Sequence, residues 1–75
     1  MQRYKNRSGD SGVVAYDIGD KSITVEFRGG DRYLYTAESS GAANIAIMQR
    51  LASAGLGLCT FISKVIRSRY ACKLD

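Results

Sequence analysis

The stretch from Ser22 to Ala37, SITVEFRGGDRYLYTA, decides the fold. In its first half every second residue is apolar, so Ile23, Val25 and Phe27 share one side and polar residues take the other. Two glycines follow, and a second alternating run extends from Arg32 to Ala37. A connection this short joins antiparallel strands, because a parallel crossover needs about a dozen residues or more. The stretch therefore predicts a β-hairpin.

The length of the hairpin loop decides which face of the sheet Tyr33 and Tyr35 occupy, since a shift of one residue moves every side chain to the other face. A two-residue loop would press Arg32 against the core and leave both tyrosines in water, as a platform for stacking bases. A three-residue loop, a type I turn with Gly30 in the left-handed conformation and a bulge, puts the tyrosines beside Val25 instead. Burying two phenol rings costs less than burying an unpaired guanidinium. We therefore favour the tyrosines as core residues.

A further strand precedes the hairpin. From Val13 the sequence alternates, with Val14, Tyr16 and Ile18 on one side, and the run ends at the turn residues Gly19-Asp20-Lys21. Together with the hairpin this strand predicts a three-stranded antiparallel meander.

Two helices are predicted after the meander. Ser40 is a suitable N-cap for the first helix, and Gly55 fits the left-handed residue that ends it. The apolar positions of this helix fall within one arc at about 100° per residue; they are Ile45, Ile47, Met48, Leu51 and Ala52. A second helix is predicted from Thr60 to Ser68. Its apolar face consists of Phe61, Ile62, Val65 and Ile66.

These elements predict the fold class α+β, a three-stranded antiparallel β-meander followed by two helices packed on one face of the sheet. A length of 75 residues fits a single domain, which we place at residues 12–75. Residues 1–11, MQRYKNRSGDS, contain almost nothing that could be buried, so we expect a flexible N-terminal arm.

No uninterrupted apolar stretch approaches the roughly 20 residues that a membrane span needs, and the first residues lack the apolar segment of a signal peptide. We therefore expect a soluble, cytoplasmic protein. Cys59 and Cys72 match no metal-binding spacing and no C-x-x-C motif, so both are expected to be free thiols.

The composition disfavours an enzyme. The chain has no histidine, which removes the commonest general base and the commonest zinc ligand. Asp17 and Asp20 flank a turn and are typical turn-stabilising residues. The segment Gly55-Leu56-Gly57 resembles the start of a dinucleotide-binding fingerprint, but it follows a helix and lacks the third glycine. We predict no catalytic residue, no metal site, no cofactor and no small-molecule substrate.

Several of these motifs together resemble the KTSC domain, a short module found alone in bacterial proteins and at the C-terminus of some lysyl-tRNA synthetases. The resemblance covers roughly residues 12 to 70 and rests on Val25-Glu26-Phe27, a glycine turn, Tyr33-Leu34-Tyr35, Leu51, Ala54-Gly55, Ile66-Arg67 and Tyr70. The chain departs from the family pattern at Glu38-Ser39, where a Val-Pro usually opens the helix, and in the additional segment from Gly55 to Cys59. The family has no established activity, and its fusion to the synthetase suggests RNA binding by association.

Basic residues gather toward the two ends of the chain. Residues 1–9 carry three bases and no acid, residues 10–38 carry six acids and three bases, and residues 39–75 carry five bases and one acid. Such clusters attract polyanions, RNA among them. The candidate nucleic-acid-binding residues are Lys64, Arg67, Arg69, Tyr70, Lys73, Arg3, Lys5 and Arg7, with Tyr70 as a ring on which a base could stack.

The sequence thus predicts a small, non-enzymatic binding module of KTSC type that contacts RNA through a basic C-terminal helix. The alternative is a protein–protein interaction module, a homodimer included, that uses an open strand edge or the exposed face of the sheet. That face would carry Thr24, Glu26, Arg28, Arg32 and Leu34.

Overall fold

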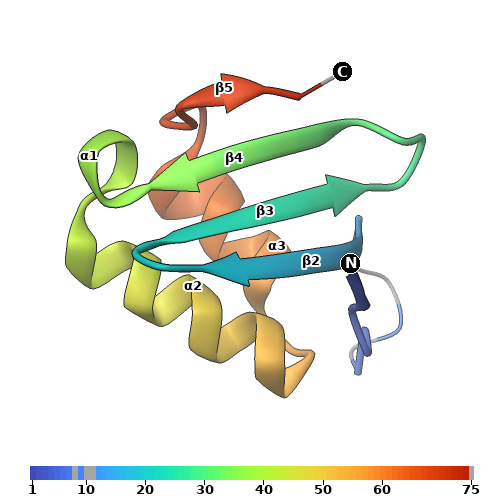
Figure 1. The fold of residues 1–75 in the computed structure, drawn as a ribbon. Helices are drawn as coiled ribbons and strands as arrows, with labels where there is room; N and C mark the ends of the chain where they lie inside the picture. Colours follow the sequence, from blue (N-terminus) through green and yellow to red (C-terminus); the bar gives the residue numbers. More distant parts are fainter. Residues whose placement is uncertain (8, 10–11, 75) are drawn as a thin grey trace.

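A computed structural model describes residues 1–7, 9 and 12–74 of the chain. The elements are β1 (Gln2–Arg3), β2 (Val13–Gly19), β3 (Ser22–Phe27), β4 (Arg32–Thr36), α1 (Ala37–Ser40), α2 (Ala42–Ala54), α3 (Leu58–Phe61), the π-helix η1 (Ile62–Ile66) and β5 (Cys72–Lys73). The described strands form one antiparallel sheet in the order β1-β2-β3-β4-β5. The helices α2 and α3 cover one face of this sheet (Figure 1). The α+β class and the central meander are confirmed, and the sheet is wider than predicted by one short strand at each edge.

The register of the β3–β4 hairpin places the tyrosines on the core face. Tyr33 lies opposite Val25 and Tyr35 lies opposite Ile23, and side chains of such pairs point to the same face. The Phe27 amide donates to the Asp31 carbonyl at 2.8 Å, which leaves a three-residue loop. Its Gly30 has a φ of 100°, as predicted, but Gly29 has a φ of 101°, so the turn is not the type I turn that we expected.

A β-bulge shifts the inward residues at the start of β2. Val13 pairs with Phe27 and Ala15 with the neighbouring Glu26, so Val14 has no partner of its own on β3. The bulge brings Val13 into the core, where it is 1% exposed, in place of Val14. Ile18, at the other end of the strand, is 42% exposed because it lies at the margin of the sheet. The predicted alternation is therefore wrong at the start of the strand, whereas Tyr16 and Ile18 share one face as predicted, opposite Val25 and Ile23.

An additional turn of helix, α1, follows β4, and Ser40 is not the N-cap of the long helix. Thr36 caps α1 reciprocally with Ser39, since each backbone N–H donates to the other residue's side-chain oxygen, at 3.0 and 3.1 Å. The helix α2 begins after Gly41, which makes no side-chain cap. Its end at Gly55, with a φ of 74°, agrees with the prediction. Of the predicted apolar face, Ile45, Met48 and Ala52 are buried and Leu51 packs against the core, whereas Ile47 is only partly buried and lies outside the core cluster.

The second predicted helix begins earlier and ends in a π-helical turn. Leu58 starts α3 and is completely buried, and Ile62 and Ile66 of η1 are buried with it. Val65 is 42% exposed, contrary to the prediction, because a π-helix has a wider turn than the 3.6 residues per turn on which the predicted face was based.

The N-terminal segment is part of the fold, so a free arm is the wrong description of its first seven residues. β1 pairs with β2, and the Tyr4 amide donates to the Val14 carbonyl at 2.9 Å. The Tyr4 side chain is 4% exposed, and its hydroxyl accepts from the Leu58 amide at 3.2 Å. Arg7 continues the attachment, with its amide donating to the Gly55 carbonyl at 2.7 Å. The buried Tyr4 ring, together with these backbone bonds, docks a segment that is otherwise polar. Residues 8, 10 and 11 of the expected arm lie outside the described residues.

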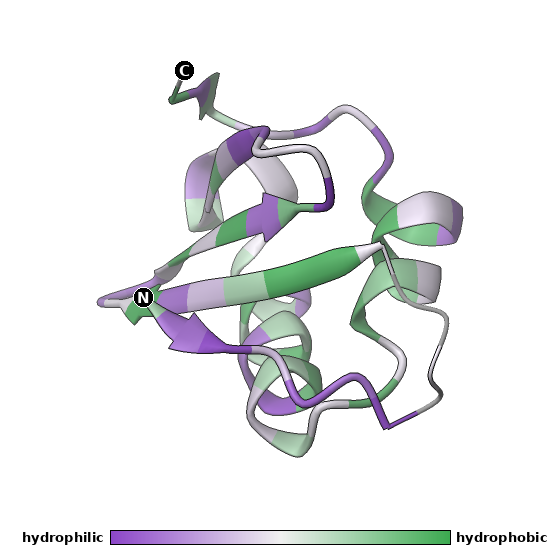
Figure 2. Cartoon of the chain, turned by 90° about the vertical axis from the view of Figure 1, so that its right-hand side faces the viewer, coloured by the Kyte–Doolittle hydropathy of each residue, from purple (hydrophilic) through white to green (hydrophobic). Residues whose placement is uncertain are grey.

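One hydrophobic core fills the space between the sheet and the helices. Its members are Tyr4, Val13, Tyr16, Ile23, Val25, Tyr35, Ile45, Met48, Ala52, Leu58, Ile62 and Ile66. A side view shows hydrophobic stretches in both layers and a hydrophilic N-terminal strand at the edge (Figure 2). Gln49 of α2 ties the layers together, because its amide nitrogen donates to the carbonyls of Gly19 and Ser22 at 3.1 and 2.8 Å.

Candidate functional site

A cleft opens between the hairpin end of the sheet and the chain that follows η1. It has a volume of about 320 Å³ and is lined by Phe27, Asp31, Tyr33, Tyr35, Ile62, Arg67, Ser68 and Tyr70. The hairpin register explains the β4 side of the cleft, because residues 31, 33 and 35 alternate onto one face of the strand. That face is buried at Tyr35 and exposed at Asp31, so β4 leads from the core to the solvent.

Tyr70 is the most exposed aromatic residue that lines the cleft. Its ring centroid lies 4.6 Å from that of Tyr33 at a tilt of 47°, and 6.3 Å from that of Tyr35 in an edge-to-face arrangement. Phe27 packs edge-on against Tyr33 at 5.8 Å. Tyr35 is 2% exposed, whereas Tyr70 is 38% exposed. The hairpin tyrosines therefore support Tyr70, and Tyr70 is the ring on which a ligand could stack.

Burial also changes the chemistry of Tyr35. Desolvation, with smaller contributions from Tyr33 and Tyr70, raises the pKa of Tyr35 from 10.0 to about 12. The shift extends the neutral form of this phenol further into the alkaline range, and the buried ring acts in the cleft as a packing group.

Charged groups line the mouth of the cleft. The ammonium of Lys73 lies 3.4 Å from an Asp31 carboxylate oxygen and 5.9 Å from the centroid of the Tyr33 ring. Both side chains of the ion pair are about half exposed, so the pair is weak and can exchange with solvent or a ligand. Arg67, an exposed basic residue, also lines the cleft. The cleft offers an exposed ring, cations and one carboxylate.

Arg67 reaches the cleft because η1 ends abruptly there. Its φ of 54° and ψ of −117° turn the chain out of the helix, and its amide donates to the Ile62 carbonyl five residues earlier. π-Helical turns of this kind are frequently found at functional sites. The turn directs the next residues back across β4.

The C-terminal segment is held against β4 by hydrogen bonds on both sides of Tyr70. The buried Ser40 hydroxyl donates to the Arg69 carbonyl at 2.8 Å. The amides of Ala71 and Leu74 donate to the carbonyls of Leu34 and Arg32, at 2.7 and 2.8 Å. These bonds position the Tyr70 ring over Tyr33.

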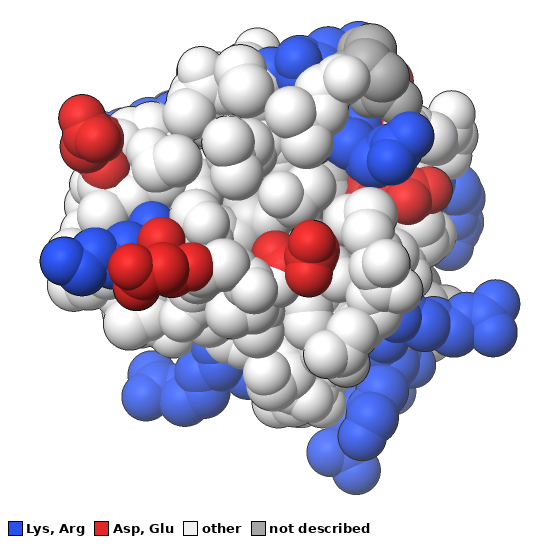
Figure 3. Space-filling model, viewed as in Figure 1, with Lys and Arg blue, Asp and Glu red and all other residues white. Residues whose placement is uncertain are grey.

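The eight predicted nucleic-acid-binding residues do not form one surface. Arg67 and Tyr70 line the cleft, Lys73 lies at its mouth, and Lys64 and Arg69 are exposed without lining it. The remaining three, Arg3, Lys5 and Arg7, belong to the N-terminal segment at the other edge of the sheet. Basic side chains accordingly project from several sides of the molecule (Figure 3).

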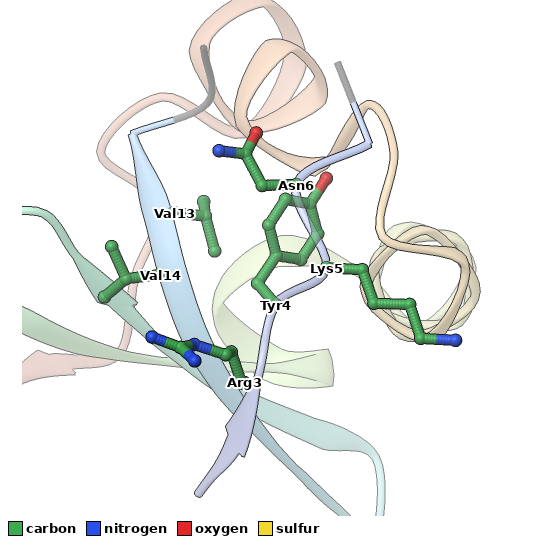
Figure 4. Close-up of a pocket in the computed structure, with 6 residues that line it drawn as sticks. All are labelled: Arg3, Tyr4, Lys5, Asn6, Val13 and Val14. Atoms are coloured by element: carbon green, nitrogen blue, oxygen red, sulfur yellow. The ribbon is translucent and has the colours of Figure 1, made fainter. Parts of the chain in front are cut away.

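The N-terminal bases border a cavity of their own. It measures about 520 Å³ and is lined by Arg3, Tyr4, Lys5, Asn6, Val13 and Val14. The side chains of Arg3 and Lys5 point away from each other, so their charges do not converge on one ligand (Figure 4). Lys5 packs against the end of α2, where a methyl group added to Gly55 would lie 2.5 Å from the Lys5 Cβ.

The sequence-based prediction missed the non-basic lining of the cleft, above all Asp31 and Phe27. The available signal was the period-two pattern, because a register that turns Tyr33 inward also turns Asp31 to the same face.

Other predicted features can be placed as well. Cys59 and Cys72 are free thiols, as expected. Among residues 1–7, 9 and 12–74, no group of three or more His, Cys, Asp or Glu residues could hold a metal ion. None of the described helices has the length and apolar character needed to cross a membrane.

Comparisons with protein-family models, with curated proteins and with solved structures found no match. The resemblance to the KTSC domain stays a prediction from the sequence.

Proposed function

We propose that this protein is a non-enzymatic binding module of KTSC type that binds single-stranded RNA at the Tyr70 cleft. The observation that carries the proposal is that a basic residue, Arg67, and a solvent-exposed aromatic residue, Tyr70, line the same cleft. Single-stranded nucleic acids are bound by this combination, in which cations contact phosphates while bases stack on aromatic side chains. Lys64 and Arg69 lie near Arg67 in the sequence and extend the basic character of this segment.

The salt dependence of binding tests the phosphate contacts. The double variant Lys64→Gln/Arg67→Gln removes two exposed charges and leaves the buried face of η1 intact. If both residues contact phosphates, the slope of log affinity against log salt should flatten by about 1.4 units for single-stranded RNA. Affinity for a uridine oligonucleotide, measured by fluorescence anisotropy over a range of salt concentrations, checks this.

Arg50→Gln is the matched control, because Arg50 is an exposed cation of α2 that does not line the cleft. Its slope should stay close to that of the wild-type protein. A wild-type protein without affinity for any single-stranded RNA at low salt would overturn the proposal.

The second candidate function is self-association through the sheet face that the helices leave uncovered (Figure 1). Glu26 and Arg32 lie opposite each other on that face, beside the pair of Thr24 and Leu34. Two copies related by a twofold axis could pair these opposite charges across an interface. The predicted open strand edge has less support, since β1 and β5 cover the two edges of the meander. Sedimentation equilibrium of the wild-type protein and of a Leu34→Glu variant distinguishes a dimer from a monomer.

A further inference from the structure

Asp31 gives the cleft a group that phosphate binding does not need. It contributes the only carboxylate among the residues that line the cleft, and its side chain is 57% exposed. Its backbone is fixed by the hydrogen bond from the Phe27 amide to the Asp31 carbonyl. The hairpin register turns it to the same face as Tyr33, on which Tyr70 packs. A base stacked on Tyr70 would therefore have a carboxylate within the same cleft.

We propose that this cleft prefers guanine, with Asp31 as the specificity-determining residue. The inference rests on the proposed function and names the base that the same site selects.

The hydrogen-bonding edges of the bases support guanine. An ionised carboxylate only accepts hydrogen bonds, and its two oxygens match two neighbouring donors. Guanine presents such a pair on its Watson–Crick edge, N1–H beside the N2 amino group. Adenine, cytosine and uracil each place an acceptor beside every donor on that edge, and the acceptor would face a carboxylate oxygen. Single-stranded RNA is read on these edges once its bases are unstacked.

The ion pair with Lys73 does not block this contact. A carboxylate has about four acceptor positions, so Asp31 can keep Lys73 on one of them while it accepts two bonds from a base. The volume of about 320 Å³ is sufficient for one base, since sites for small molecules begin at about 300 Å³.

Guanine could reach the cleft in RNA or as a free nucleotide, and both would make the same contacts with Asp31. The experiment includes both sources. Fluorescence anisotropy at low salt measures the affinity for uridine oligonucleotides that carry one central G, A, C or inosine. A separate competition titration measures the affinity for free GMP.

The wild-type protein should bind the oligonucleotide with G more tightly than those with A or C, by about 5- to 150-fold for a good bidentate contact. Inosine, which lacks the N2 amino group, should fall between G and A.

Asp31→Asn should lose the preference, because its amide offers one donor and one acceptor in place of two acceptors. The control Lys73→Gln should keep the preference, since it leaves the carboxylate in place. Thermal unfolding of each variant checks that the fold is retained.

The outcomes separate the two proposals. Equal affinity for all four oligonucleotides would overturn the guanine preference and leave RNA binding standing. A preference that survives in Asp31→Asn would overturn the role of Asp31. GMP binding as tightly as the oligonucleotide with G would support the guanine site and identify the free nucleotide as its source. Binding to none of the ligands would overturn both proposals.

Discussion

Ionisation of the Tyr35 phenol makes the stability of the protein depend on pH in the alkaline range. The pKa of Tyr35 is raised from 10.0 to about 12, chiefly by burial, so the unfolded chain loses this proton at a lower pH than the folded chain does. The stability that Tyr35 contributes in its neutral form is therefore fully present below pH 10 and is lost as the pH rises to about 12.

Tyr35→Phe tests this linkage because it removes the ionisable group and keeps the ring. Between pH 10 and 12 the free energy of unfolding of the wild-type protein should fall more than that of Tyr35→Phe, by at most about 3 kcal/mol. Chemical denaturation at a series of alkaline pH values measures the difference. Parallel curves for the two proteins would mean that Tyr35 titrates as a free phenol.

Tyr70 has a structural and a proposed binding role, and two substitutions separate them. Tyr70→Phe keeps the ring that packs on Tyr33, whereas Tyr70→Leu keeps an apolar side chain without a ring. If the ring stacks on a base, Tyr70→Leu should weaken RNA binding by roughly 1 to 3 kcal/mol with little change in salt slope. Tyr70→Phe should bind like the wild type. Wild-type affinity in a folded Tyr70→Leu protein would exclude stacking at this position.

The single turn α1 contributes a structural contact through its buried residue Ser40. The Ser40 hydroxyl donates to the Arg69 carbonyl, so this single turn holds the C-terminal segment that carries Tyr70. Ser40→Ala should lower the free energy of unfolding by about 1 kcal/mol and speed amide exchange at Ala71. Ser53→Ala, at an exposed position of α2, is the control; it should not lower the free energy of unfolding, since alanine favours a helix, and should leave exchange at Ala71 unchanged. Equal exchange in the two variants would show that the Ser40 bond does not anchor the segment.

The elements also show which parts of the fold could be predicted from the sequence. The hairpin and α2 carry their signals locally, in alternation, in glycines with positive φ and in an apolar arc. β1 and β5 have two residues each, too few for any period, and they exist because distant strands offer partners.

The cleft was predicted only in part for the same reason. Arg67 and Tyr70 could be proposed from residue type, as a cation and a ring close together in the chain. The contribution of Asp31 depends on the register of the hairpin, and the direction of Arg67 depends on the end of a π-helix. The hairpin register followed from the local pattern, but that Asp31 lines a cleft depends on the distant segment after η1 that forms its other side, and the π-helical end at Arg67 has no local signal.

At the scale of the whole molecule, the first residues decide how complete the core is. A chain of 75 residues has a small core, and the N-terminal segment adds Tyr4 to it and covers the free edge of β2. The polar composition of this segment concealed its role, because one buried ring, the short pairing of β1 with β2 and the backbone bonds of Tyr4 and Arg7 dock it.

Tyr4→Ala should therefore be among the most damaging single changes in the protein. Removing a buried aromatic ring costs about 3 to 5 kcal/mol, against a total stability of about 5 to 15 kcal/mol for a typical domain. Tyr4→Phe should cost only about 1 kcal/mol, since it removes the hydroxyl that accepts from the Leu58 amide. Arg3→Ala, at the exposed neighbouring position, should have little effect. Denaturant midpoints for the three variants measure this order, and equal midpoints for Tyr4→Ala and Arg3→Ala would mean that the segment is a free arm after all.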